Sequence, residues 1–334
     1  RVIVYNSLRH SYKDNTYKGV DIIHKCLPDS WLGTGSQYIY DLFCLRDAIR
    51  LKADVIIECG YASAAPWYKV LRRGGIKLVT HMDGMEWKRE KWNALTKNIF
   101  LRAENLAVRY SDVIVCDHPV IGDYYREMYS VSPEIIPYGA EIRKDFDLSI
   151  LDELGLKSGS YYLLIARLEP ENNIRMIIEG FLASGAGESL VVVGDYSGKH
   201  GRQIFRDFGN NKRLRFIGGV FDPKLLDHLR HYSKAYFHGH SVGGTNPSLL
   251  EAMAAGALVI AHDNPYNRWV LGENGGYFRY ADEVTEHIIG IGKLERERDK
   301  YCRNNIERIR TDFQWDSVVN QYEQLFTRLI GSAD

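Results

Sequence analysis

The stretch HSVGGTNPSLLEAMAAG, His240 to Gly256, has the pattern of a glycine turn that leads into a helix. Gly243 and Gly244 permit a positive φ and let a ligand approach the backbone closely. Asn246 is a good N-cap residue, and Pro247 suits the first position of a helix. The stretch therefore predicts a strand-to-helix junction of the kind found in α/β proteins.

The start of this helix is also a candidate anion site, because the first N–H groups of a helix lack partners within it and carry the positive end of its dipole. We expect the N–H groups of Ser248, Leu249 and Leu250 to face a phosphate. Glu251 lies one turn into the helix, where it can accept hydrogen bonds from a hydroxylated group carried by that phosphate. An ordinary strand-to-helix junction explains the same residues equally well, since glycine turns are common.

The bulk composition is that of a globular protein without a nucleic-acid partner. The 334 residues suggest two domains, and the 43 basic residues balance the 43 acidic ones. The five cysteines form no CxxC pair, which predicts free thiols in a reducing compartment and argues against a zinc site. The sequence has no apolar run of transmembrane length and no signal peptide, so a cytoplasmic location is expected. Because the chain enters an apolar run directly at Arg1, we expect a piece upstream to be absent.

Short apolar runs alternate with helix-length segments along the chain, which is typical of parallel sheets covered on both faces. The helix that ends at Tyr110 shows a stripe of Ile99, Ala103, Leu106 and Tyr110. The last helix, Trp315 to Ile330, shows a stripe of Val318, Tyr322, Phe326 and Ile330, and residues 138–160 have the composition of a linker. The predicted strands are 2–5, 54–59, 76–80, 112–116 and 134–137 in the first half, and 161–166, 190–194, 214–217, 235–238, 258–261 and 276–278 in the second.

Open parallel sheets bind ligands at the carboxyl ends of their strands, and several polar or glycine residues of the second half follow predicted strands. Arg167 follows the strand YYLLIA, where its guanidinium can pair with a phosphate or form a salt bridge with Glu169 or Glu171. Gly194 ends the next strand, and Gly219 and Val220 follow the third.

In the first half, His81, Asp83 and Glu86 cluster after a predicted strand. Either carboxylate can act as a base toward an attacking hydroxyl or hold a sugar hydroxyl. For Glu86, a charge interaction with a helix start is an equally good interpretation.

A basic and aromatic run follows this cluster, and it can contact an anionic membrane surface or a lipid phosphate. A solvated helix face with two half-buried tryptophans is the alternative interpretation. The residues of this run are Trp87, Lys88, Arg89, Lys91 and Trp92.

Several common motifs are absent from the sequence. It contains neither a P-loop nor GxGxxG, and no DxD pair near a strand end, so a transferase that holds its donor through a DxD-bound metal is disfavoured. His238, His240 and His262 lie near strand ends without a metal-ligand pattern, which indicates packed or cleft-lining histidines.

Three motifs together resemble the family 4 glycosyltransferases of the GT-B fold: ARLEPENN (166–173), DGMEWKREKW (83–92) and the stretch from His240 to Gly256. The resemblance is nearest to bacterial rhamnosyltransferases that extend cell-wall or capsular polysaccharides. It implies two Rossmann-like, doubly wound α/β domains that face each other across a cleft. Residues 1–145 would bind the acceptor, 146–314 the nucleotide sugar, and a helix in 315–334 would cross back onto the first domain.

The resemblance also implies roles for individual residues. Arg167 would neutralise the donor diphosphate, Glu251 would hold the donor ribose, and Asp83 would lie at the reaction centre. The full predicted catalytic set is Asp83, Glu86 and His81. The full predicted donor-binding set is Arg167, Asn172, Gly194, Gly219, Val220, Gly243, Gly244, Thr245, Asn246, Ser248 and Glu251.

The sequence departs from the general family pattern at three places. Gly243 stands where the first of two glutamates is usual, and Asn172 where many members have a lysine. The similar rhamnosyltransferases share both features. The usual first strand and its glycine-rich loop would lie upstream of Arg1.

Together these features predict a retaining glycosyltransferase that needs neither metal nor cofactor. The expected donor is dTDP-rhamnose or another dTDP- or UDP-linked sugar, and the expected acceptor is a glycan or a lipid-linked saccharide of bacterial surface polysaccharide synthesis. A sugar-nucleotide epimerase, a phosphorylase and a non-catalytic nucleotide-sugar-binding protein remain alternatives, although no lysine motif for pyridoxal phosphate supports the phosphorylase.

Overall fold

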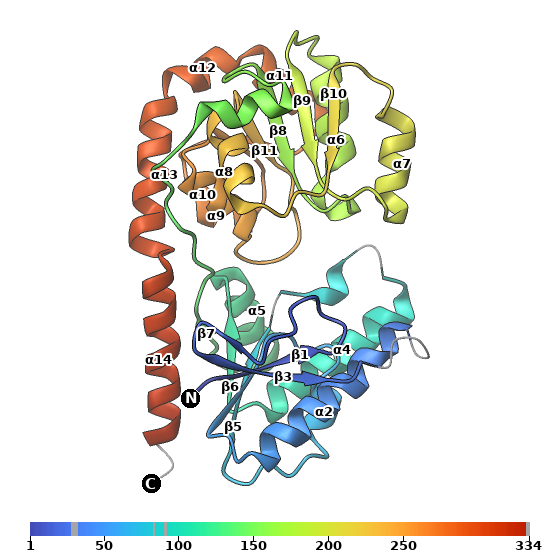
Figure 1. Ribbon diagram of the computed structural model, residues 1–334, viewed down its shortest axis with the longest axis vertical. Coiled ribbons are helices and arrows are strands. Elements are labelled where there is room, and N and C mark those ends of the chain that lie inside the picture. Colours follow the sequence, from blue (N-terminus) through green and yellow to red (C-terminus); the bar gives the residue numbers. More distant parts are fainter. Residues whose placement is uncertain (28–32, 83, 90–91, 332–334) are drawn as a thin grey trace. The chain divides into compact units, whose positions relative to one another are not determined.

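The computed structural model describes residues 1–27, 33–82, 84–89 and 92–331, and the chain divides into two compact units (Figure 1). The first unit comprises Arg1–Trp87, Trp92–Ile135 and the chain from Tyr322 onward. The second comprises Lys88–Lys91 and Ile136–Gln321.

The second unit is built on a six-stranded sheet in the order β10-β9-β8-β11-β12-β13, and all neighbouring strands are parallel. The chain starts at β8 in the middle, runs outward to β10, and then returns to place β11 on the other side of β8. This is the strand order of a doubly wound α/β domain. Its strands are β8 (Tyr161–Ile165), β9 (Ser189–Val193), β10 (Leu214–Gly218), β11 (Ala235–His238), β12 (Val259–His262) and β13 (Gly276–Phe278).

Both faces of this sheet are covered, because successive strand residues point to opposite sides and both sets are apolar. Leu163, Val191 and Tyr236 belong to one buried cluster, whereas their chain neighbours belong to a second. The helices are α6 (Ile174–Ala183), α7 (Lys199–Phe208), α8 (Pro223–Tyr232), α9 (Pro247–Ala254), α10 (Pro265–Leu271), α11 (Ala281–Ile289), α12 (Ile291–Arg296) and α13 (Arg298–Asp312). The last helix, α14 (Trp315–Gly331), begins in this unit and belongs to the first unit from Tyr322 onward.

The first unit carries two sheets. The four strands β4 (Val55–Glu58), β5 (Lys77–His81), β6 (Val113–Cys116) and β7 (Glu134–Ile135) form a parallel sheet in chain order. A separate three-stranded sheet has the order β1-β3-β2, with β1 (Ile3–Ser7), β2 (Thr16–Tyr17) and β3 (Val20–Lys25). The helices of this unit are α2 (Ser36–Arg50), α3 (Ala65–Tyr68), α4 (Ala94–Tyr110) and α5 (Pro119–Tyr129).

Each predicted strand has a counterpart in the structure, with bounds that differ by two residues at most, but β2 and β3 were not predicted. β2 is only two residues long, and the six residues of β3 include Asp21, His24 and Lys25, so neither has a continuous apolar run. The predicted linker is partly wrong as well. Leu151 within the 3-10 helix Leu148–Leu154 is buried in the core of the second unit.

Two predicted helix stripes are also corrected. In α4 the buried residues are Ala103, Glu104 and Ala107, whereas Ile99 is exposed. In α14 the buried residues are Val318, Leu325 and Leu329, and Ile330 is exposed. A helical stripe read from apolar residues alone misses a buried charge such as Glu104.

No disulfide bond joins any of the five cysteines, all of which the structure describes; Cys44 and Cys116 are buried, whereas Cys26 and Cys59 are exposed. Among the helices that the structure describes, none has both the length and the apolar character needed to cross a bilayer.

Candidate functional site

The candidate site lies at the carboxyl ends of β8 and β11, where the order of the second sheet reverses. The chain leaves β8 toward β9 on one side and leaves β11 toward β12 on the other. Such a switch point separates the two connecting loops and leaves a crevice, which is where open α/β sheets bind ligands. Arg167 follows β8, and His240 follows β11, so the fold brings together two segments that are distant in sequence.

Arg167 has an exposed side chain at this edge, whereas its backbone is firmly held. Its carbonyl oxygen accepts hydrogen bonds from Asn172 Nδ2 and from the N–H of Glu169, both at 2.7 Å. In the part of the chain that the structure describes, the guanidinium forms no ion pair, and Glu171 is itself buried. The salt bridge considered as an alternative is therefore not formed, and the guanidinium is available to an anion.

Asn172 holds the two loops together and does not present a free amide to a ligand. It is 6% exposed, and its Nδ2 donates to the carbonyl of Arg167. Its Oδ1 lies 2.8 Å from Nδ1 of His240 and accepts that N–H. The Cβ of any other residue at Gly239 would lie 2.0 Å from the Asn172 carbonyl oxygen, so the glycine permits this approach. The predicted donor contact of Asn172 is thus replaced by a positioning role.

His240 is neutral and has a defined tautomer. Burial, followed by nearby cationic charge, lowers the pKa of His240 to about 4. Because Nδ1 carries the proton donated to Asn172, Nε2 carries a lone pair. Nε2 lies 2.9 Å from the position that a Cβ would take at Gly243, whose φ is +129°. The glycine loop therefore has a hydrogen-bond acceptor beside it, at a histidine for which the sequence predicted a packed or cleft-lining position but no hydrogen-bonding role.

The helix start at Asn246 corrects one prediction. Asn246 is the N-cap of α9 and Pro247 is its first residue, as predicted. However, the N–H of Ser248 donates to Asn246 Oδ1, and those of Leu249 and Leu250 donate to the Asn246 carbonyl. These three groups therefore already have acceptors. In the described part of the chain the N–H groups of Gly243 and Gly244 have no hydrogen-bond partner, so the amides that can meet an anion precede the helix.

Most of the other predicted donor-binding residues are packed rather than exposed. Thr245 is 2% exposed, and the Ser248 hydroxyl lies 2.9 Å from the hydroxyl of Tyr236. Gly194 is required for packing, because a Cβ there would lie 2.1 Å from the carbonyl oxygen of Ala166. Val220 packs against the core, whereas Gly219 is exposed.

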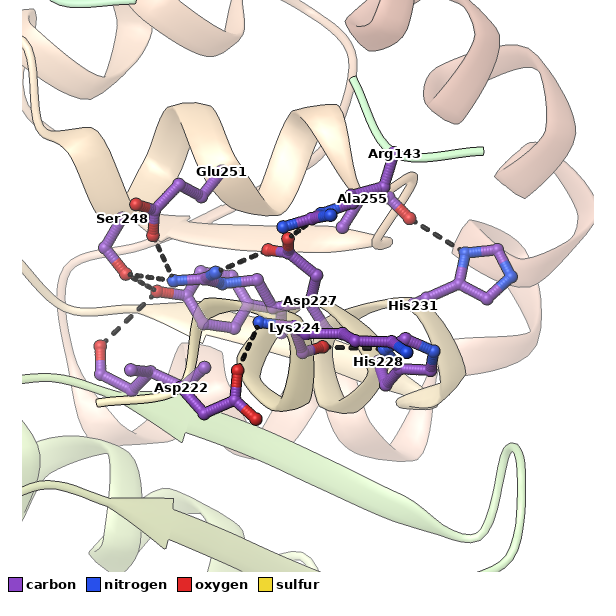
Figure 2. A network of polar contacts seen from close by, with 12 residues as sticks. Arg143, Asp222, Lys224, Asp227, His228, His231, Ser248, Glu251 and Ala255 are labelled. Carbon is purple, nitrogen blue, oxygen red and sulfur yellow. Dashed lines mark hydrogen bonds and ion pairs between the residues drawn. The ribbon is translucent and has the colours of Figure 1, made fainter. Parts of the chain in front are cut away.

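Glu251 is half-exposed and is held by an arginine that the sequence did not single out. Arg230 of α8 donates from Nη2 to Glu251 Oε2 at 2.5 Å and to Ser248 Oγ at 3.3 Å. The Nη1 of Arg230 donates to Asp227 Oδ1 at 3.0 Å, and Asp227 Oδ2 accepts from Arg143 at 2.8 Å. Figure 2 shows this network, which places two carboxylates around one buried guanidinium.

In the first unit, two of the three predicted catalytic residues are described. His81 ends β5 and is 5% exposed, and burial lowers its pKa to about 4, so it is neutral. Glu86 begins the short 3-10 helix Glu86–Lys88 and is half-buried. Asp83 lies outside the described residues.

The tryptophans of the basic run are packed into the first unit. The Nε1 of Trp87 donates to Oε2 of the buried Glu104 at 3.0 Å, and the ring of Trp92 packs edge-on against Phe100. Glu104 also accepts hydrogen bonds from the hydroxyls of Tyr61, Tyr124, Tyr125 and Tyr129. This arrangement matches the half-buried alternative considered for the tryptophans; Lys91 lies outside the described residues.

Two family models match the chain. Residues 6–141 match a domain of unknown function (DUF1972), and residues 151–311 match the glycosyl transferases group 1. Curated relatives include an uncharacterized glycosyltransferase of Methanocaldococcus jannaschii, 24% identical over 50% of this chain. A second is a phosphatidyl-myo-inositol mannosyltransferase of Mycolicibacterium smegmatis, 26% identical over 59% of this chain. The matches span about half of these relatives, 44% and 52% of their lengths.

Solved structures share the fold across nearly the whole chain. A sucrose-phosphate synthase from Thermosynechococcus elongatus has a TM-score of 0.80 and 15% identity, covering 99% of this chain and 89% of its own. The Anabaena protein HepE, solved with UDP and glucose, has a TM-score of 0.73 and 18% identity, covering 92% of this chain and 86% of its own. These likenesses confirm the predicted GT-B fold.

Proposed function

We propose that this chain, whose residues 151–311 belong to the group 1 glycosyl transferases, transfers a sugar from a nucleotide-sugar donor to a hydroxyl of a saccharide acceptor. One observation carries the proposal. An exposed guanidinium, a glycine loop with unpaired amides and a half-exposed glutamate come from segments that meet at the switch point of the second sheet. Anabaena HepE, which shares the fold, has been solved with UDP and with UDP-glucose, and this supports a nucleotide-sugar donor here.

Each element of the site suits one part of such a donor. Arg167 and the N–H groups of Gly243 and Gly244 bind the diphosphate and stabilise its charge as it departs. Glu251 accepts a hydrogen bond from a ribose hydroxyl, and the lone pair on Nε2 of His240 accepts one from a sugar hydroxyl. A neutral histidine suits this role because it adds no charge beside the sugar.

The proposed reaction retains the anomeric configuration. The bond from the anomeric carbon to the diphosphate oxygen breaks, and the acceptor oxygen bonds to the same face of that carbon. The proton of the acceptor hydroxyl passes to the departing diphosphate oxygen. Asp83, Glu86 and His81 of the first unit orient the acceptor, with Asp83 closest in role to a base. No metal takes part, because Arg167 and the loop amides supply the stabilising charge.

The finer assignment is dTDP-rhamnose as donor and a bacterial surface polysaccharide precursor as acceptor, and it rests on the resemblance of the three motifs. Transfer of rhamnose to a glycan or lipid-linked acceptor, with NMR of the product linkage, tests it. An inverted linkage would exclude retention, and an activity abolished by EDTA would exclude a metal-independent reaction. Isomerised donor formed without acceptor would instead indicate an epimerase.

Peripheral membrane contact through Lys88 and the neighbouring residues of the basic run is also part of the proposal. Sedimentation of the protein with anionic vesicles tests this contact.

Binding of UDP and dTDP by isothermal titration calorimetry tests the diphosphate site directly. Charge-assisted hydrogen bonds contribute about 1.5–3 kcal/mol, so Arg167→Ala should weaken binding roughly 10- to 150-fold. The matched control is Arg175→Ala, because Arg175 is a half-exposed arginine of the same unit that already pairs with Glu179 and Asp207. Equal affinity of the Arg167 variant and the control would refute the assignment.

A further inference from the structure

We infer that Arg230 is a positioning residue that fixes the Glu251 carboxylate for ribose recognition; the inference rests on the proposed function. Glu251 lies on α9 and Arg230 on α8, and the two side chains meet at 2.5 Å. The Arg230 side chain is only 2% exposed, whereas that of Glu251 is 46% exposed. Arg230 is therefore too buried to reach a ligand, and Glu251 is the member of the pair that can.

The geometry leaves one carboxylate oxygen for a ligand. Arg230 binds Oε2 of Glu251, and in the described part of the chain Oε1 has no hydrogen-bond partner. A free glutamate on a helix surface samples several rotamers, and ordering it on binding costs conformational entropy. A carboxylate already held through one oxygen avoids that cost and presents the other oxygen in one direction.

The guanidinium is itself fixed from the opposite side. Asp227, one turn before Arg230 on α8, accepts from Nη1 at 3.0 Å and has its second oxygen paired with Arg143 at 2.8 Å. Nη2 also contacts the hydroxyl of Ser248 at 3.3 Å, so the same group ties the first turn of α9 to α8. Arg230 therefore links the Glu251 carboxylate to both packed helices.

A lysine cannot replace this arrangement, because the planar guanidinium reaches Asp227 and Glu251 with different nitrogens, while an ammonium is a single point charge. Arg230→Lys keeps the positive charge and much of the side-chain volume, but it loses the two separate nitrogens that bind Asp227 and Glu251. The variant thus separates positioning from net charge.

The experiment is a double-substitution cycle read out by ligand affinity. Wild-type protein, Arg230→Lys, Glu251→Gln and the double variant are each titrated with UDP and with its 2′,3′-dideoxyribose analogue. The matched control is Arg213→Lys, because Arg213 of the same unit donates to the carbonyls of Leu182 and Ala186 and contacts no part of this network. Thermal unfolding of every variant shows which ones are folded.

We expect Arg230→Lys to weaken UDP binding by about tenfold and to leave binding of the dideoxy analogue unchanged, a coupling within the range of neighbouring polar groups. The double variant should bind UDP no more weakly than Glu251→Gln alone, and Arg213→Lys should keep the wild-type preference for ribose. A merely structural role for Arg230 would lower affinity for both ligands equally.

Three results would overturn the inference. The first is that Arg230→Lys keeps the wild-type ratio of the affinities for UDP and for the dideoxy analogue. The second is that the loss of UDP affinity in the double variant equals the product of the losses in the two single variants. If Glu251→Gln also keeps that affinity ratio, the ribose assignment of the proposed function fails as well, and the two failures are thereby distinguished. If Arg230→Lys does not fold, Asp227→Asn replaces it, because this variant keeps Arg230 but removes the carboxylate charge that holds its guanidinium. Asp227→Asn should lose part of the preference for UDP over the dideoxy analogue. An unchanged preference in this variant is the third result that would overturn the inference.

Discussion

Substituting Gly239 with alanine tests whether the close approach of two loops builds the candidate site. A Cβ at this position would lie 2.0 Å from the backbone oxygen of Asn172 and 2.9 Å from Cδ1 of Ile177. The Ile177 methyl group can rotate away, but the backbone oxygen cannot. Real Cβ contacts essentially never fall below 3.0 Å, so the end of β11 and the loop of Asn172 must separate by about 1 Å.

Overpacking of this kind costs about 1–3 kcal/mol, and a backbone obstacle places Gly239→Ala near 3 kcal/mol. For a unit of this size the melting temperature should fall by roughly 6–12 °C. The separation also breaks the hydrogen bond from His240 to Asn172, so UDP binding should weaken together with stability.

Differential scanning calorimetry measures the effect, since it can resolve the transitions of the two units. The matched control is Gly187→Ala, because Gly187 has nothing within 4 Å of its would-be Cβ and no positive φ. Alanine there should leave stability unchanged or raise it by up to about 1 kcal/mol, through the lower entropy of the unfolded chain. If the melting temperatures of Gly239→Ala and Gly187→Ala differ by less than about 2 °C, the reasoning from the loop contact is wrong.

Two further predictions concern stability. Glu104→Ala removes the acceptor of the buried hydroxyls of Tyr61 and Tyr125, and at about 1–3 kcal/mol for each buried donor the first unit should lose roughly 2 kcal/mol or more. Chemical denaturation measures this loss against exposed Glu127→Ala, and a loss under about 1 kcal/mol would contradict the role of Glu104. Burial lowers the pKa of both His81 and His240 from 6.5 to about 4, so the unfolded chain binds protons first as pH falls. Stability from these groups is therefore complete above pH 6.5 and is lost between pH 6.5 and 4, by up to about 1.4 kcal/mol per pH unit for each histidine. His240→Gln should flatten the fall in melting temperature between pH 6.5 and 5, and equal slopes in variant and wild type would refute this.

Local sequence was sufficient for the strands of the second unit and for the start of α9. The apolar runs that predict β8, β9, β11 and β12 are short and continuous, because these strands are mostly buried. Asn246 and Pro247 mark the start of α9 through their own chemistry, which needs no distant partner. Arg167 could be singled out for the same reason, since it directly follows a recognisable strand.

The three-stranded sheet of the first unit had no such signal. β3 (VDIIHK) has only two adjacent apolar residues, Ile22 and Ile23, and it pairs with β1 across an intervening segment of the chain. Glu104 was likewise hidden, because its partners come from several elements and a buried carboxylate looks like a surface residue in a helical pattern.

The sequence by itself determined which residues follow the strands and where α9 begins, and it indicated that Gly243 and Gly244 permit a positive φ, which the structure has at Gly243. Only the tertiary structure decided which polar groups remain available. Asn246 uses the N–H groups at the helix start, Asn172 sets the tautomer of His240, and Arg230 holds Glu251 from another helix. The physical reason is that strand and cap patterns arise from neighbours along the chain, whereas hydrogen-bond partners are chosen by packing between segments far apart in sequence.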